Sequence, residues 1–146
     1  MTDRPTVLYA CIHNSGRSVA AQVLTRHYAG DAVEVLSAGS EPGSTVNPAV
    51  AQVLTDHGLS VADHVPTLLD PDLVQRSDVV VTMGCGETCP FYPGKRYEDW
   101  EVEDPAGQDP ATVRRIVADV DVRVRQLLGE LAPLHQLPLP LITSAD

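Results

Sequence analysis

The chain has 146 residues, with 20 Asp and Glu against 10 Lys and Arg, and its net charge of −10 argues against binding to nucleic acid or an anionic membrane surface. No apolar run approaches the ~20 residues of a membrane span, and the N-terminus shows no signal-peptide pattern. Three cysteines, an odd number, indicate reactive thiols in a reducing, cytoplasmic setting. The length predicts one domain, residues 1–146, with a proline-rich tail from about residue 133.

The first third of the chain is predicted to alternate strands with helices. Residues 6–11 are apolar and partly β-branched, which is typical of a buried strand, and residues 17–29 carry apolar positions at helical spacing. A second strand is predicted at residues 33–38, where polar and apolar residues alternate. A second helix begins at Pro48, because Asn47 is a good N-cap and proline suits the first helical position.

The remaining two thirds continue the same alternation. We predict a short helix from Pro71 to Arg76, a buried strand at residues 79–83 and a short strand at residues 95–100. A long amphipathic helix is predicted at residues 110–132, with Asp109 as its cap. Strands that alternate with helices predict an α/β fold, with a parallel sheet covered by helices on both faces. Ligands of such sheets bind at the carboxyl ends of the strands.

The loop between the first strand and the first helix, Cys11-Ile12-His13-Asn14-Ser15-Gly16-Arg17-Ser18, is the candidate site. A strand that passes through small residues into a helix directs several backbone N–H groups and the helix N-terminus at one point, which favours a bound anion. Cys11 and Arg17 are expected to face the same oxyanion, and the cationic surroundings favour the nucleophilic thiolate. All residues from Ile12 to Ser18 are predicted to contact this oxyanion.

Individual side chains in this loop have predicted roles. Asn14 suits a left-handed backbone conformation and is expected to fix the loop through its amide. Ser15 and Gly16 are expected to offer mainly N–H groups, and Ser18 is expected to form a hydrogen bond with the thiolate. His13 is interpreted as a residue of the rim rather than a catalyst.

The pattern Cys-x5-Arg-Ser after a first strand resembles the phosphate loop of the low-molecular-weight protein tyrosine phosphatase superfamily, and the form Cys11-x-His13-Asn14-x-Gly16-Arg17-Ser18 is most similar to its arsenate reductase branch. The similar pieces span nearly the whole chain and include Ser37-Ala38-Gly39, residues 77–83 and Asp104-Pro105. The resemblance implies a four-stranded parallel sheet. It also implies that Asp104 is the general acid that protonates the departing oxygen.

The residues after Asp104 favour one branch over the other. In the tyrosine phosphatase branch, aromatic residues follow Asp-Pro and sandwich the substrate phenol, whereas this chain has Ala106-Gly107 and an aromatic content of 4%. A small inorganic oxyanion fits this pattern better than phosphotyrosine does.

Two further cysteines, Cys85 and Cys89, fit the arsenate reductase branch because arsenate reduction needs thiols as electron donors. Cys85 is predicted to attack the sulfur of Cys11, and Cys89 then forms a Cys85–Cys89 disulfide that a thioredoxin clears. The spacing of these cysteines departs from the thioredoxin-linked type. Which of the two attacks first is therefore left open, as is a low-molecular-weight thiol, mycothiol or glutathione, in place of the relay.

The sequence predicts no essential metal and no tightly bound cofactor. The histidines are scattered without metal-ligand spacing. Gln22 and Thr67 stand where some relatives carry acidic residues beside a potassium ion.

The preferred interpretation is a cytoplasmic arsenate reductase. Its partners are arsenate, with phosphate or sulfate able to occupy the site, and a thioredoxin, mycoredoxin or glutaredoxin as external reductant. The first alternative is a phosphatase that acts on phosphotyrosine or a small phosphomonoester. The second alternative is a non-catalytic oxyanion-binding or thiol-redox sensor module.

Overall fold

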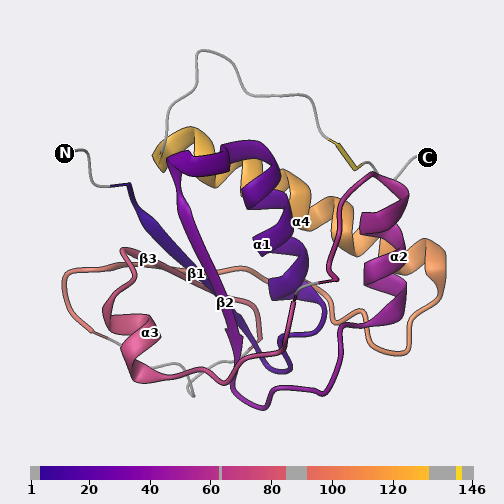
Figure 1. Cartoon of the computed structure of the whole chain (residues 1–146), viewed down its shortest axis with the longest axis horizontal. Coiled ribbons are helices and arrows are strands. Elements are labelled where there is room, and N and C mark those ends of the chain that lie inside the picture. Colours follow the sequence, from indigo (N-terminus) through magenta and orange to yellow (C-terminus); the bar gives the residue numbers. More distant parts are fainter. Residues whose placement is uncertain (1–3, 63, 85–91, 132–140, 143–146) are drawn as a thin grey trace.

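The computed structural model describes residues 4–62, 64–84, 92–131 and 141–142 (Figure 1). A parallel sheet lies at its centre, with strand order β2-β1-β3-β4. The strands are β1 (Thr6–Cys11), β2 (Glu34–Gly39), β3 (Val79–Thr82) and β4 (Arg96–Asp99). The predicted four-stranded parallel sheet is thereby confirmed, with β1 at the centre and β2 at an edge.

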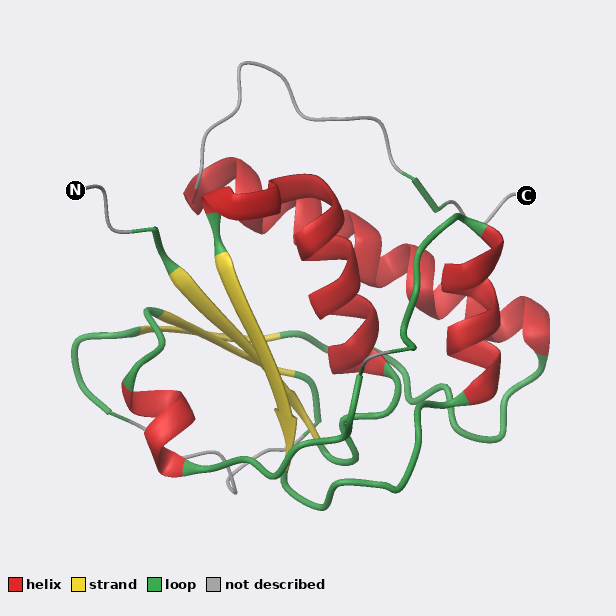
Figure 2. Cartoon of the chain, viewed as in Figure 1, coloured by secondary structure: helices red, strands yellow, loops and turns green. Residues whose placement is uncertain are grey.

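The helices cover both faces of the sheet, as predicted (Figure 2). They are α1 (Arg17–Ala29), the single 3₁₀ turn η1 (Gly30–Ala32), α2 (Pro48–Asp56), α3 (Pro71–Gln75) and α4 (Pro110–Leu131). Helices α1, α2 and α4 pack on one face and the short α3 lies against the other. No helix in the described ranges is long and apolar enough to cross a membrane.

The alternation of side chains along β1 explains how one strand serves two cores. Val7, Tyr9 and Cys11 point into the large core under α1, α2 and α4, whereas Leu8 packs with Val80 in the smaller core under α3. Since all of these side chains are at most 2% exposed, β1 is buried from Val7 to Cys11. The strand therefore delivers Cys11 from the core to the carboxyl edge of the sheet.

Side-chain caps fix where the helices begin. The Oδ1 atom of Asn47 accepts hydrogen bonds from the backbone N–H groups of Ala49 and Val50, at 2.9 and 3.2 Å. Asp109 accepts one from the N–H of Thr112 at 3.0 Å, so both predicted caps are confirmed. An N-cap of this kind stabilises a helix by about 1 kcal/mol.

A buried polar network attaches residues 141–142 to the helical layer. Asp121 is fully buried and pairs with Arg125 at 3.1 Å. Its carboxylate accepts from the hydroxyl of Tyr28 and from the N–H of Ile142, at 2.8 and 3.1 Å. Burial raises the pKa of Tyr28 to about 12, so this hydroxyl stays a donor at neutral pH.

Candidate active site

The Sγ atom of Cys11 lies at the carboxyl end of β1, where the chain turns into α1. Cys11 is only 2% exposed, but it lines a cavity that opens at this edge of the sheet. Its sulfur accepts a hydrogen bond from the backbone N–H of Asn14 at 3.2 Å and lies 2.9 Å from the Oγ atom of Ser18. Both neighbours stabilise a negative charge on sulfur.

The peptide groups of the loop from Cys11 to Gly16, which we call the phosphate loop, have their carbonyls turned outward. Four of these carbonyls accept hydrogen bonds from N–H groups of the loop between β2 and α2: Ser40 to Cys11 at 3.1 Å, Glu41 to Ile12 at 2.7 Å, Gly43 to His13 at 2.9 Å, and Asn47 to Ser15 at 2.7 Å. The described peptide bonds are trans, and in a planar trans peptide the N–H points opposite to the C=O. The N–H groups of the phosphate loop therefore point inward, toward the cavity.

Asn14 holds this loop in shape. It has a positive φ of 50° and is fully buried, which confirms the predicted left-handed conformation. Its side-chain N–H donates to the Oγ of Ser18 at 2.8 Å, and its Oδ1 accepts from the N–H of Thr67 at 2.9 Å. The carbonyl of Asn14 accepts from the Nε2 of His64 at 3.2 Å.

Sequence reasoning did not find the role of His64. The residue is 50 positions from Asn14 and carries no spacing signal, so only the fold brings the two together. Burial lowers the pKa of His64, and the nearby charge of Arg26 adds to this effect. His64 is therefore a neutral donor at neutral pH, with its Nε2 hydrogen directed at the phosphate loop.

Arg17 is fixed on two sides. One terminal nitrogen donates to the carbonyl of Val102 at 3.2 Å, and the other lies 3.9 Å from the carboxylate of Asp104. Gly84 packs on the guanidinium so closely that a Cβ atom there would lie 2.7 Å from Nη1. Arg17 is only 8% exposed, so its guanidinium is held in place. Because Asp104 is 3.9 Å away, the two do not form a tight ion pair, and the positive charge stays available to an anion.

Asp104 also lines this cavity. Its Oδ1 atom accepts a hydrogen bond from the N–H of Ala106 at 3.0 Å, which closes a tight turn over Pro105. The side chain is 51% exposed, so the acid lies at the open side of the cavity.

The cavity has a volume of about 40 Å³, roughly three water-sized volumes. The structure brings together Cys11, Arg17 and Asp104 around it, as the sequence predicted. The described lining contains no Phe, Tyr or Trp side chain and consists of Cys11, His13, Ser15, Gly16, Arg17, Asn47, Asp104, Pro105 and Ala106. His13 lies at the rim, where its Nδ1 contacts the carbonyl of Glu41 at 3.0 Å.

Cys85 and Cys89 lie outside the described residues, so their predicted relay stays a prediction. Among the residues that the structure describes, no group of three or more His, Cys, Asp or Glu side chains is placed to hold a metal ion. Gln22 stands where some relatives carry an acidic residue beside a potassium ion. In this chain its side-chain carbonyl accepts a hydrogen bond from the hydroxyl of Ser37 at 2.6 Å.

Comparisons with known proteins agree on one group. The family model described as low molecular weight phosphotyrosine protein phosphatase matches residues 6–136. An arsenate reductase from Bacillus cereus is 32% identical over 131 residues, 86% of this chain and 96% of that protein. A solved arsenate reductase from Archaeoglobus fulgidus has a TM-score of 0.73 at 35% identity, over 84% of this chain and 98% of that one.

A second solved structure is more similar still. It is a thioredoxin-dependent arsenate reductase from Corynebacterium glutamicum, with a TM-score of 0.81 and 45% identity. The match covers 89% of this chain but 63% of that one, so the present chain spans less than two thirds of its length.

Proposed function

The chain belongs to the low molecular weight phosphotyrosine protein phosphatase family, and we propose that within it the protein is an arsenate reductase that draws its electrons from thiols. One observation carries the proposal. The cavity that holds Cys11, Arg17 and Asp104 has a volume of about 40 Å³ and no Phe, Tyr or Trp side chain in its described lining. Such a site has room for a tetrahedral inorganic oxyanion, and its described lining lacks the pair of Phe, Tyr or Trp rings between which a phenol would stack.

In the first step, the thiolate of Cys11 attacks the arsenic atom of arsenate. The inward N–H groups of the phosphate loop and the guanidinium of Arg17 bind the oxygens and neutralise their charge, which stabilises the transition state. A sulfur–arsenic bond forms while one arsenic–oxygen bond breaks. Asp104 donates the proton with which this oxygen departs as water.

In the second step, a second thiolate attacks the sulfur of Cys11, and a disulfide forms. The sulfur–arsenic bond breaks, its electron pair passes to arsenic, and As(V) leaves as arsenite, As(III). We propose that Cys85 supplies this thiolate and that Cys89 then displaces Cys11 to give a Cys85–Cys89 disulfide. A thioredoxin dithiol reduces that disulfide and supplies the two electrons of the net reaction.

Thioredoxin is favoured as reductant because the Corynebacterium glutamicum protein, 45% identical to this chain, is described as thioredoxin-dependent. In the other version of the second step, the thiolate of mycothiol or glutathione attacks the sulfur of Cys11, and arsenite leaves with the electron pair of the sulfur–arsenic bond. A mycoredoxin or glutaredoxin then reduces the mixed disulfide on Cys11. Both versions need reduced thiols, and we therefore place the reaction in the cytoplasm.

An arsenite assay with three reductant systems tests this function. Arsenate-dependent arsenite formation is measured with thioredoxin, with mycothiol plus mycoredoxin, and with glutathione plus glutaredoxin. We expect turnover with thioredoxin, none after Cys11→Ser, and loss after Cys85→Ser or Cys89→Ser in the thioredoxin arm alone.

Hydrolysis of p-nitrophenyl phosphate, followed in parallel, separates the two alternatives. Rapid hydrolysis that is insensitive to Cys85→Ser and Cys89→Ser, with no arsenite in any arm, indicates a phosphatase. Binding of arsenate without turnover of either substrate indicates a non-catalytic module.

A further inference from the structure

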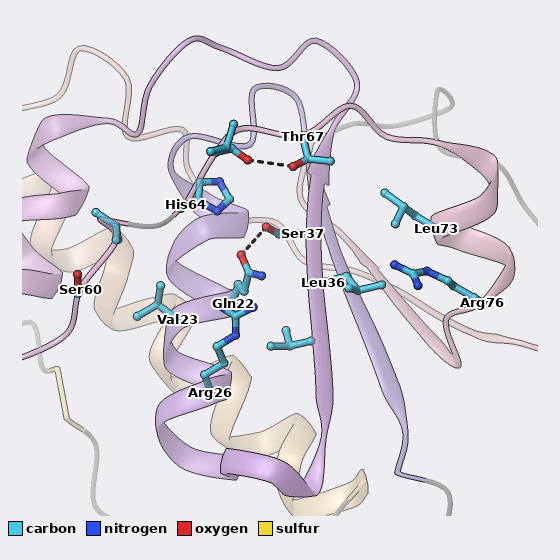
Figure 3. A pocket seen from close by; sticks show the side chains of 13 residues that line it. Gln22, Val23, Arg26, Leu36, Ser37, Ser60, His64, Thr67, Leu73 and Arg76 are labelled. Atoms are coloured by element: carbon cyan, nitrogen blue, oxygen red, sulfur yellow. Dashed lines mark hydrogen bonds between the residues drawn. The ribbon is translucent and has the colours of Figure 1, made fainter.

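A larger cavity, of about 390 Å³, lies at the open edge of the sheet along β2 (Figure 3). It does not include Cys11 and is separate from the catalytic cavity. Gln22 and Arg26 reach it from α1, and Arg76 reaches it from the end of α3, on the other side of β2. The function proposed above makes no use of it.

Among the described residues, the charged side chains that line this cavity are both positive. They are Arg26 and Arg76, and no described Asp or Glu lines it, although acidic residues outnumber basic ones two to one in the chain. Within the described ranges, neither guanidinium forms a side-chain hydrogen bond or an ion pair. Arg26 also borders a neighbouring cavity that contains Asp31 and Glu34, where Glu34 pairs with Arg4 at 3.6 Å rather than with Arg26.

Gln22 adds a neutral donor that points the same way. The side chain is 8% exposed, and its carbonyl oxygen already accepts from the hydroxyl of Ser37 at 2.6 Å. The amide nitrogen of Gln22 has no hydrogen-bond partner in the described part of the chain, where every fully buried side-chain nitrogen has one. This nitrogen is therefore not fully buried, and it faces the cavity that Gln22 lines. Two guanidinium groups and an amide thus offer only N–H donors, which is the chemistry that recognises an anion.

We infer that this cavity binds a small molecule carrying phosphate or carboxylate groups, held by Arg26, Arg76 and the amide of Gln22. Its volume falls within the range of about 300–1,000 Å³ that is typical of small-molecule sites. Apolar side chains of Val23, Leu36 and Val61 complete the lining, so the ligand has room for a carbon skeleton as well as its anionic groups.

The position of the cavity couples it to the phosphate loop. His64 lines the cavity and donates to the carbonyl of Asn14 at 3.2 Å. Thr67 also lines it, and its N–H donates to the Oδ1 of Asn14 at 2.9 Å. A ligand that orders His64 and Thr67 therefore supports the residue that shapes the phosphate loop.

Titration of the ¹⁵N-labelled full chain with citrate in one arm and pyrophosphate in the other tests this inference. We expect saturable shifts of the amide resonances of residues 22–26, 35–37 and 60–67. The probe that binds with the higher affinity, citrate or pyrophosphate, identifies carboxylate or phosphate as the preferred group. Arg26→Gln and Arg76→Gln should each weaken this binding by about tenfold. Arg123→Gln, which removes the same charge from α4 outside the cavity, is the matched control and should leave the affinity unchanged.

The inference is overturned if neither probe gives saturable shifts in those segments, or if the shifts are confined to residues 11–18. It is overturned equally if both arginine variants bind as tightly as the wild type. None of these outcomes depends on arsenate turnover, so the failure of this site and the failure of the proposed reductase are distinguishable.

Discussion

The Oγ atom of Ser18 lies 2.9 Å from the Sγ atom of Cys11, and the amide of Asn14 donates to the same Oγ at 2.8 Å. When Cys11 is a thiolate its sulfur carries no hydrogen, so in that state the hydroxyl of Ser18 is the donor of this hydrogen bond. Ser18 is therefore a donor to the thiolate and stabilises it both before attack and when it leaves.

Removing that donor should slow the chemistry of Cys11. We expect Ser18→Ala to lower the rate of alkylation of Cys11 by iodoacetamide by about tenfold at neutral pH, since a hydrogen bond to a charged group contributes roughly 1.5–3 kcal/mol. The rate is measured by intact mass in a Cys85→Ser, Cys89→Ser background. Ser44→Ala, in an exposed part of the neighbouring loop, is the control; equal rates in both variants would contradict the assignment.

Gly84 should act through Arg17. Gly84→Ala introduces a Cβ that would lie 2.7 Å from Nη1 of Arg17, and the φ of +95° adds backbone strain. We expect kcat/KM for arsenate to fall by at least about tenfold, because the guanidinium that binds the oxyanion is displaced.

Gly94→Ala separates these two effects. Gly94 has a similar φ of +88°, but a Cβ there meets nothing within 4 Å. The variant Gly94→Ala should therefore lose about as much free energy of unfolding in a urea titration as backbone strain costs Gly84→Ala. Its kcat/KM should stay near the wild-type value. A similar loss of kcat/KM in both variants would mean that backbone strain, rather than contact with Arg17, is the cause.

Asn14 should be needed for both stability and catalysis. Asn14→Ala removes one buried and one partly buried hydrogen bond and places an alanine at a φ of 50°, so we expect a loss of about 2–4 kcal/mol in the free energy of unfolding. Asn14→Gly keeps the conformational freedom but not the hydrogen bonds, and it should recover part of the stability. Thermal unfolding of both variants measures the difference, and equal melting temperatures would show that backbone strain plays no part.

His64 should make the fold sensitive to mild acid. Burial lowers its pKa in the folded chain below the ordinary value of 6.5, so the unfolded chain takes up the proton first as the pH falls. Stability is thus lost as the pH drops through and below 6.5. Urea titrations at neutral pH and near pH 5 measure this loss in the free energy of unfolding. The loss should be smaller in His64→Gln than in the wild type, and it should equal that of the wild type in the control His27→Gln, where the histidine is exposed.

Local signals in the sequence were sufficient for the elements and for one half of the site. The caps at Asn47 and Asp109 and the strand–loop–helix pattern around Cys11 depend on neighbouring residues, and the structure has all of them where they were predicted. Asp104 was placed through family resemblance rather than spacing, and the structure brings it to within 3.9 Å of Arg17.

Contacts between residues distant in sequence could not be predicted. Gly39 is part of a family-like piece of sequence, but nothing in the sequence shows which residues it contacts. A Cβ there would lie 2.5 Å from the carbonyl oxygen of Ile12, so its lack of a side chain lets β2 approach the phosphate loop. His64 and Thr67 reach Asn14 across 50 and 53 positions. No periodicity or spacing encodes such packing, because it is set by how the layers of the fold come together.

Single-turnover arsenic speciation tests the central claim most directly. Fully reduced protein is mixed with one equivalent of arsenate and no external reductant, and both arsenite and free thiols are counted. We predict one arsenite per chain and the loss of two of the three thiols, with neither change in Cys11→Ser. Arsenate recovered unchanged, with every thiol of the wild-type chain still free, would contradict reduction at Cys11 through the internal relay.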